Sequence, residues 1–225
     1  MPQKSLTLSI FVILLISGCM LIPDIPATVK GSGNVISETR EVSGITSIDL
    51  QDSIEVNVKF GAVESLVITG EDNIIFLIET NVSNHQLIIK TKPLMTYSAT
   101  KPVRVDVTVT SLEGITLSGS GSLELSGYRG DSLTMDLSGS GTLSADGTAN
   151  TVTITQGGSG DVDAHRLSVK KATVVLSGSG NVTVFASDEL DATISGSGQI
   201  RYSGNPNKIN KNISGSGTII NSDDR

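Results

Sequence analysis

The sequence predicts an all-β protein whose C-terminal half is a parallel β-helix, a solenoid of about 19 residues per coil, and whose N-terminal half is a less regular β structure. Three observations predict this fold. A Ser-Gly-Ser-Gly phrase recurs at nearly constant steps, the apolar residues around it alternate with period two, and the apolar residues are almost all aliphatic. Aromatic residues make up only 3% of the 225 residues, which suits a core of stacked branched aliphatic side chains.

The phrase occurs five times, and Gly157-Gly158-Ser159-Gly160 is a degenerate copy in the one gap. The complete copies are Ser118–Gly121, Ser138–Gly141, Ser177–Gly180, Ser195–Gly198 and Ser214–Gly217. The closing glycines are therefore 20, 19, 20, 18 and 19 residues apart. A fixed step of this size is typical of a solenoid in which each repeat is one coil. A β-sandwich, the alternative for short strands, gives no reason for a constant step.

Residues around each phrase alternate between apolar and polar, as in half-buried strands. Every second residue around the third complete copy gives Val174, Leu176, Gly178, Gly180, Val182 and Val184. Since the alternation continues through the phrase, we expect its glycines to face the core and its serines to face solvent. We expect glycine there because a crowded corner often needs positive φ. Turn-forming residues such as Gly127–Asp131 and Gly147–Asn150 predict a second bend in each coil.

Residues 31–112 are predicted to form a β module continuous with the regular solenoid of residues 113–225. Gly31-Ser32-Gly33-Asn34-Val35 resembles a first copy of the phrase, but no close repeat follows it. Strand-like runs occur at 45–50, 53–60, 65–69, 73–78, 86–92 and 103–110. Residues Pro93–Pro102 are the predicted long loop. The module is either an irregular continuation of the solenoid or a cap over its end, where strand edges would be unpaired.

The first 18 residues are predicted to be a lipoprotein signal peptide. Lys4 precedes an apolar run, Leu6–Ile16, that is too short to cross a bilayer as a helix. The run ends in Ile-Ser-Gly before Cys19, which resembles the bacterial lipoprotein signal, so we expect Cys19 to be acylated and to anchor the protein to a membrane. Met20 follows instead of an aspartate, which by resemblance to enteric sorting signals points to the outer membrane. Residues 19–30 are the predicted tether.

Composition excludes several classes of function. The net charge of −7 argues against nucleic acid, whose phosphates require a basic footprint. Cys19 is the single cysteine, so no intrachain disulfide is expected. There is no Gly-x-Ser-x-Gly elbow and no phosphate-binding loop. We therefore expect no enzymatic activity and no cofactor.

The signal peptide and the recurring phrase together make the chain resemble the family called putative auto-transporter adhesin, head GIN domain. The likeness covers about Val35 to Asn221 and is carried most clearly by Ile115–Leu123, Leu176–Val182 and Ile194–Ile200. The resemblance implies right-handed β-helical modules in secreted or lipid-anchored proteins of bacterial envelopes. It supplies no catalytic residues.

One dense polar cluster, Asp161, Asp163, His165 and Arg166, is the candidate polar face. β-Helical polysaccharide lyases use acidic and basic residues on a coil face, but no neighbouring coil adds a facing carboxylate here. The cluster follows Gly157–Gly160, which superficially resembles a calcium-binding repeat. Other copies have hydroxyls or amides at the position of Asp161, and calcium needs six to eight oxygens, so no metal site is expected. A solvated outer face is the preferred interpretation.

These observations favour a lipid-anchored, non-enzymatic β-helix protein of the bacterial envelope that contributes to adhesion or binds a glycan or envelope polymer. Repeated polar groups at one coil spacing can match a repeating polymer through weak multivalent contacts. Two alternatives stay open. One is a lyase-like enzyme that uses the Asp161–Arg166 face, and the other is a structural or sensory component that binds a protein partner.

Overall fold

The computed structural model describes residues 27–223. The predicted signal peptide and Cys19 lie outside the described residues. Within the described part, no helix is long and apolar enough to cross a membrane.

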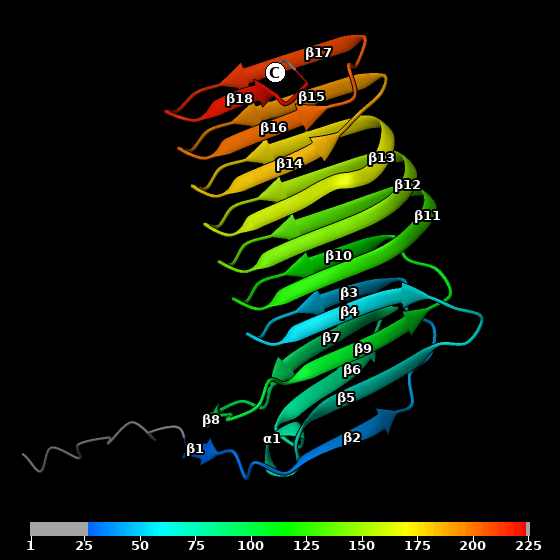
Figure 1. Ribbon diagram of the computed structural model, residues 1–225, viewed down its shortest axis with the longest axis vertical. Helices are drawn as coiled ribbons and strands as arrows, with labels where there is room; N and C mark the ends of the chain where they lie inside the picture. The colour runs from blue at the N-terminus through cyan, green and yellow to red at the C-terminus, as the bar shows by residue number, and fades with distance from the viewer. Residues whose placement is uncertain (1–26, 224–225) are drawn as a thin grey trace, which may run out of the picture.

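The C-terminal half is a solenoid in which each coil has two strands separated by a corner (Figure 1). The strands that follow the corners form one sheet: β4 (Glu55–Phe60), the first parts of β11 (Ser122–Leu137), β12 (Thr142–Gln156) and β13 (Asp161–Leu176), then β14 (Asn181–Phe185), β16 (Gln199–Ser203) and β18 (Thr218–Asn221). The strands that precede the corners form the other: β3 (Ser47–Leu50), β10 (Gly114–Leu117), the second parts of β11 to β13, β15 (Glu189–Ile194) and β17 (Lys208–Ile213).

Neighbouring coils pair as parallel strands, which confirms the predicted β-helix and excludes a sandwich of antiparallel sheets. Leu123 pairs with Leu143, Leu143 with Val162, and Val162 with Val182. These steps match the steps of the glycine phrase. The paired residues are buried, so each apolar position forms an aliphatic ladder along the axis of the solenoid.

The glycines of the phrase are needed for a reason other than the expected one. None of them has a positive φ, which occurs instead in the bend on the opposite side, at Gly127 and Gly147. At Gly139, Gly158 and the equivalent positions, a Cβ would lie closer than 3.0 Å to the carbonyl oxygen of the corner below. Successive corners therefore stack too closely for any side chain. The alternation of exposed and buried positions through the phrase is as predicted, since the serines are exposed and the closing glycines are mostly buried.

The N-terminal half extends both faces of this solenoid, and because β11 to β13 run around the bend, all its strands except β1 and β8 belong to one continuous 16-stranded sheet. The remaining elements are β1 (Ala27–Lys30), β2 (Val35–Arg40), β5 (Ser65–Glu71), α1 (Asp72–Ile75), β6 (Ile78–Ser83), β7 (Gln86–Thr91), β8 (Met95–Ser98) and β9 (Arg104–Val109). β3 pairs with β7 and β10, and β4 pairs with β9 and β11, so β3 and β4 form a coil inserted between two others. β2, β5 and β6 close the end with antiparallel pairing.

The run 73–78, predicted as a strand, is instead the helical turn α1 followed by the start of β6. Ile74 and Ile75 are both fully buried. Consecutive side chains of a strand point to opposite faces, so at the end of the solenoid a strand would expose one of the two, whereas a helical turn buries both. Asn73 holds the turn in place, because its amide accepts from the Ser32 amide at 3.0 Å and donates to the Lys30 carbonyl at 2.7 Å.

Two further expectations for the N-terminal half were wrong. Gly31–Val35 is not a corner of the solenoid, since Ser32 and Asn34 instead hydrogen-bond to the Asp72 carboxylate at the start of α1. The loop Pro93–Pro102 contains a strand, β8, which pairs in parallel with β1. Its partner β1 comprises Ala27–Lys30, the last four residues of the predicted tether.

Candidate functional site: a polar groove along the corners

The corners carry a row of exposed serines, one from each coil, that we call the corner row: Ser120, Ser140, Ser159, Ser179, Ser197 and Ser216. Backbone hydrogen bonds between coils set its spacing. The amide of Ser140 donates to the Gly119 carbonyl, and the amide of Ser159 to the Gly139 carbonyl, both at 3.2 Å. Parallel strands lie about 4.8 Å apart, so the row presents one hydroxyl about every 4.8 Å.

A second row runs beside the first, where each strand leaves its corner. We call it the strand row, and its members pair from coil to coil: Glu55, Ser122, Thr142, Asp161, Asn181, Gln199 and Thr218. Its amides bridge neighbouring coils. Asn181 Nδ2 donates to Asp161 Oδ1 at 2.8 Å, and Gln199 Nε2 donates to Thr218 Oγ1 at 3.1 Å. The row is therefore a continuous line of hydrogen-bonding groups.

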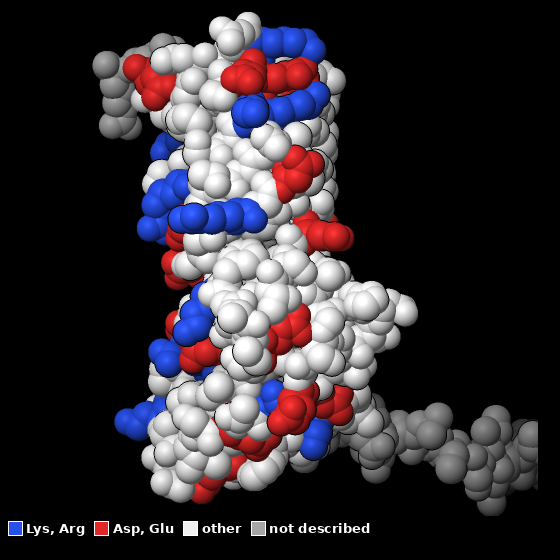
Figure 2. Space-filling model, turned by 90° about the vertical axis from the view of Figure 1, so that its right-hand side faces the viewer, with Lys and Arg blue, Asp and Glu red and all other residues white. Residues whose placement is uncertain are grey.

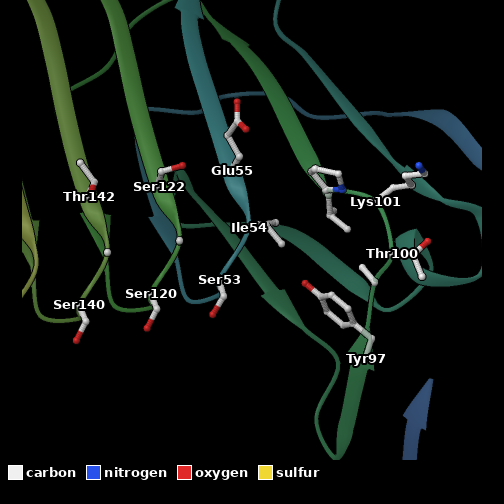
Figure 3. A pocket seen from close by; sticks show the side chains of 15 residues that line it. Ser53, Ile54, Glu55, Tyr97, Thr100, Lys101, Ser120, Ser122, Ser140 and Thr142 are labelled. Atoms are coloured by element: carbon white, nitrogen blue, oxygen red, sulfur yellow. The ribbon is translucent and has the colours of Figure 1, made fainter. Parts of the chain in front are cut away.

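At the N-terminal end of both rows, the segment after β7 forms a wall and turns the surface into an open groove of about 680 Å³. Tyr97, Thr100 and Lys101 form the wall, while serines and threonines of the two rows form the floor (Figure 3). The Tyr97 ring lies against the corner of β3 and β4, with its hydroxyl directed toward the side of Ser53. The groove thus combines an aromatic ring, an ammonium group, the Glu55 carboxylate and regularly spaced hydroxyls.

The wall is held by the buried side chain of Glu71 at the end of β5. Its carboxylate accepts from the Thr100 hydroxyl at 2.6 Å, the Thr100 amide at 2.8 Å and the Gly33 amide at 2.6 Å. The Thr100 hydroxyl, followed by the backbone amides, holds the pKa of Glu71 below its usual 4.5 against the opposing effect of burial. Glu71 is therefore an ionised clamp that joins the wall to the turn before β2.

Tyr97 stays protonated at neutral pH. Burial of the ring, together with the charge of Asp52, raises the pKa of the phenol to about 12. A protonated phenol both donates and accepts hydrogen bonds, and its ring offers an apolar surface. Sugars present hydroxyls at their edges and C–H groups on their faces, so this side chain suits a carbohydrate.

Of the four residues of the predicted polar face, the structure brings Asp163 and His165 into contact, whereas Asp161 and Arg166 have other partners. Asp161 belongs to the strand row, next to Thr142 in the groove. Asp163 contacts His165 through Oδ1 and Nδ1 at 2.5 Å, with both side chains about half exposed. Arg166 approaches Glu124 at 3.9 Å. Counting five residues from the closing glycines Gly141 and Gly160 would put His165 opposite Asp146, but a bulge in β13 places Arg166 there.

No group of three or more potential metal-ligating side chains occurs among residues 27–223. On the side of the molecule with the bends, acidic and basic side chains are interspersed instead of forming a patch of one sign (Figure 2). The polar lining of the groove consists mainly of neutral hydroxyl groups, and Glu55 and Lys101 are its charged residues.

Sequence reasoning missed Tyr97, Lys101 and Glu55, although it singled out the corner serines and Asp161. The length of the Pro93–Pro102 segment was the available signal, since long loops often carry function. What the sequence did not reveal is that this segment occupies the place of a corner, between β7 and β9, and so lies beside the corner row.

Comparisons with known proteins agree with the fold. The model of the family described as "Putative auto-transporter adhesin, head GIN domain" matches residues 44–206, which confirms the resemblance carried by the repeated phrase. A putative adhesin from Bacteroides fragilis NCTC 9343 is 23% identical with a TM-score of 0.72, over 86% of this chain and 99% of that one. A search among curated proteins finds no match.

Two proteins from Parabacteroides distasonis ATCC 8503 are also similar. One, described as a putative lipid binding protein, is 22% identical over 87% of this chain and 99% of its own, with a TM-score of 0.56. The other, a putative adhesin, is 20% identical over 87% of this chain and 100% of its own, with the same TM-score. At these identities the likeness shows the fold alone.

Proposed function

The chain belongs to the family described as "Putative auto-transporter adhesin, head GIN domain". From this premise we propose that it is a non-enzymatic, lipid-anchored protein. We further propose that it binds a glycan or another repeating envelope polymer in the groove between the wall and the two rows. An adhesin-type domain indicates a location in the bacterial envelope. The sequence around Cys19 supports the anchor, and Met20 after it supports the outer membrane.

One observation carries the binding proposal: two parallel rows of hydrogen-bonding side chains repeat at the coil spacing and enter a walled groove. Each group alone would bind a sugar hydroxyl weakly, because it exchanges one hydrogen bond with water for another. A rigid row makes each further contact intramolecular once the first has formed, which raises the overall affinity of a polymer above that of its unit. The groove is open along its length, so it admits a chain as well as a chain end.

Binding is tested with the full-length protein on a panel of cell-wall, capsular and host glycans. Tyr97→Ala and Ser120→Ala with Ser140→Ala remove the ring and two floor hydroxyls. Thr148→Ala with Ser168→Ala removes two polar groups on the bend side and serves as the matched control. We expect the groove variants to lose about tenfold in affinity, roughly the effect of one or two hydrogen bonds, and the control to bind like the wild type.

Two results would overturn the proposal. Equal retention of the groove and control variants would exclude the groove, and retention of no polymer by the wild type would exclude polymer binding. Release of soluble products from a polyuronate, abolished by Asp163→Ala, would instead show a lyase. The mass of the N-terminal peptide of the mature protein tests the anchor, because acylation of Cys19 adds the mass of the fatty-acyl chains.

A further inference from the structure

We propose that the N-terminal end of the solenoid is a phospholipid-facing surface, on which Phe76 and Leu94 enter the interfacial region of the bilayer and Lys30 and Lys92 meet head-group phosphates. We call these four residues the basal patch. The proposal deepens the proposed function, and it rests on the lipid anchor at Cys19. The test measures the acylation of Cys19 and the contact of the basal patch with the bilayer, which we call seating, independently of each other.

Hydrogen bonds connect the segments that carry the basal patch. Phe76 directly follows α1, and Asn73 in α1 donates to the Lys30 carbonyl at 2.7 Å. The Lys92 amide donates to the Leu77 carbonyl at 2.8 Å. This hydrogen bond joins Leu77, the neighbour of Phe76, to a residue two positions before Leu94. Phe76 is 57% exposed and Leu94 is 71% exposed, which leaves two large apolar side chains in water on one end of the molecule.

Leu94 is both exposed and in an unfavourable backbone conformation. It occupies the third position of the turn Lys92–Met95, closed by the Met95 amide on the Lys92 carbonyl at 3.2 Å, with φ at 61°. Pro93 suits the second position, but the third requires the left-handed region, where glycine or asparagine is normal and leucine is strained. In the folded protein, the Leu94 side chain is not buried and its backbone does not adopt a favourable φ. An apolar partner outside the chain accounts for it, since strained exposed residues cluster at ligand-binding sites.

The charges at this end also suit a phosphate-rich surface. Among the carboxylates nearby, Glu38 accepts from Arg40 at 2.8 Å and Asp72 accepts from Asn34 at 2.9 Å. Glu79 lines the same hollow as Arg40, Lys90 and Lys92, so cationic groups outnumber it there. Within residues 27–223, neither Lys30 nor Lys92 takes part in an ion pair. Lys92 and Phe76 line one hollow of about 560 Å³. Apolar side chains flanked by lysines are the composition of an interfacial membrane contact.

The length of the chain before β1 decides which end of the solenoid faces the bilayer. Seven residues separate Cys19 from Ala27, so an acylated Cys19 keeps β1 within at most about 29 Å of the membrane surface. The other end exposes Ile209, Ile213 and Ile220, but β17 lies eight strand positions from β6, about 38 Å farther along the axis. The basal patch is the apolar end within reach of the anchor, and seating on it stands the solenoid upright with the corner rows leading away from the bilayer.

The experiment places one reporter at a time on the full-length protein. Cys19 is the only cysteine and is blocked when acylated, so Leu94→Cys and Phe76→Cys each add a single labelling site for an environment-sensitive fluorophore. Val63→Cys is the matched control, because Val63 is an apolar residue 77% exposed on the β4–β5 loop, which projects on the side opposite β8 (Figure 1). Ile209→Cys reports the far end.

Labelled proteins are mixed with vesicles of phosphatidylethanolamine and phosphatidylglycerol that carry brominated acyl chains. We expect several-fold stronger quenching at positions 94 and 76 than at 63 and 209, and we expect Lys92→Glu to weaken it. Equal quenching at all four positions, or the strongest at 209, would overturn the seating. The mass of the N-terminal peptide is read from the same samples. Acylation without quenching at 94 rejects the seating and keeps the anchor. If Cys19 is not acylated, the labelling is repeated with Cys19→Ser, so that position 94 is again the single labelling site, and quenching there rejects the anchor and keeps the seating.

Discussion

The stacking of glycine corners predicts a sharp difference between two adjacent residues, Gly157 and Gly158. A Cβ on Gly158 would lie closer than 3.0 Å to the carbonyl oxygens of Gly139 and Ser138 in the coil below. A Cβ on Gly157 would have nothing within 4 Å, and its φ is not in the left-handed region. The same Gly→Ala change is therefore expected to be harmful at one position and harmless at the next.

The size of the effect follows from the contacts. To bring the new Cβ to an ordinary van der Waals distance, the corner of Gly158→Ala must move away from the corner below by about 1.5 Å. Two hydrogen bonds cross there, from the Ser159 and Gly160 amides to the Gly139 carbonyl at 3.2 and 3.3 Å. Their loss costs about 1 kcal/mol each, and overpacking adds about 1–3 kcal/mol. We expect a loss of about 3–5 kcal/mol in the free energy of unfolding.

Urea unfolding followed by circular dichroism measures this difference, and the midpoints of the variants are compared directly. Gly157→Ala should lie within about 0.5 kcal/mol of the wild type, as should Gly157→Ser, which restores the complete phrase. Gly158→Ala should unfold at clearly lower urea, with a melting temperature lower by roughly 6–20 °C for a domain of this size. Equal stability of the two variants, or a larger loss at 157, would refute the close-stacking argument.

Two further predictions concern buried polar groups. Gln156 is fully buried, its Nε2 donates to the Gly160 carbonyl, and its Oε1 has no partner among the described residues. Gln156→Leu, which places leucine where neighbouring coils have it, is expected to stabilise the protein by about 1 kcal/mol in urea unfolding. A loss of stability would show that the hydrogen bond from the Gln156 amide to Gly160 contributes more than the unpaired oxygen costs. Glu71→Gln should destabilise the protein at pH 7 and speed hydrogen exchange at the Thr100 amide. Because the folded pKa of Glu71 lies below the unfolded 4.5, its contribution is present above pH 4.5 and disappears as the pH falls through the folded value. A stability difference between wild type and Glu71→Gln that stays constant from pH 7 to pH 3 would contradict this assignment.

The regular half of the fold was accessible from the sequence because its rules are local. Each coil repeats the same alternation, so Leu143, Val162 and Val182 could be aligned by counting from the glycines, and the structure pairs them in that register. Counting fails at the two bulges where β12 pairs with β11 and with β13, and the second places Arg166 where counting from the glycines would put His165. The role of glycine was also misjudged, since sequence reveals that no side chain is tolerated but not whether a backbone angle or a neighbouring carbonyl forbids it.

The candidate site was only half accessible. The corner serines and Asp161 follow from the repeat, but Tyr97 and Lys101 belong to a segment with no periodic pattern. Their place depends on β7 and β9 bracketing that segment and on Glu71 clamping it, contacts between residues far apart in the chain. Likewise, Ile74 and Ile75 read as part of a strand until the end of the solenoid required both to be buried.

The amino-acid order alone determined that this protein winds into a solenoid and where each coil turns, because only glycine can stand where one corner rests on the carbonyl groups of the next. Tertiary structure alone decided that β3 and β4 are inserted between coils that follow them in sequence, and that β8 stands beside the corners as the wall of a groove. Those arrangements depend on which strand edges match in length, pairing direction and buried surface across distant parts of the chain, and no short stretch of sequence records such a match.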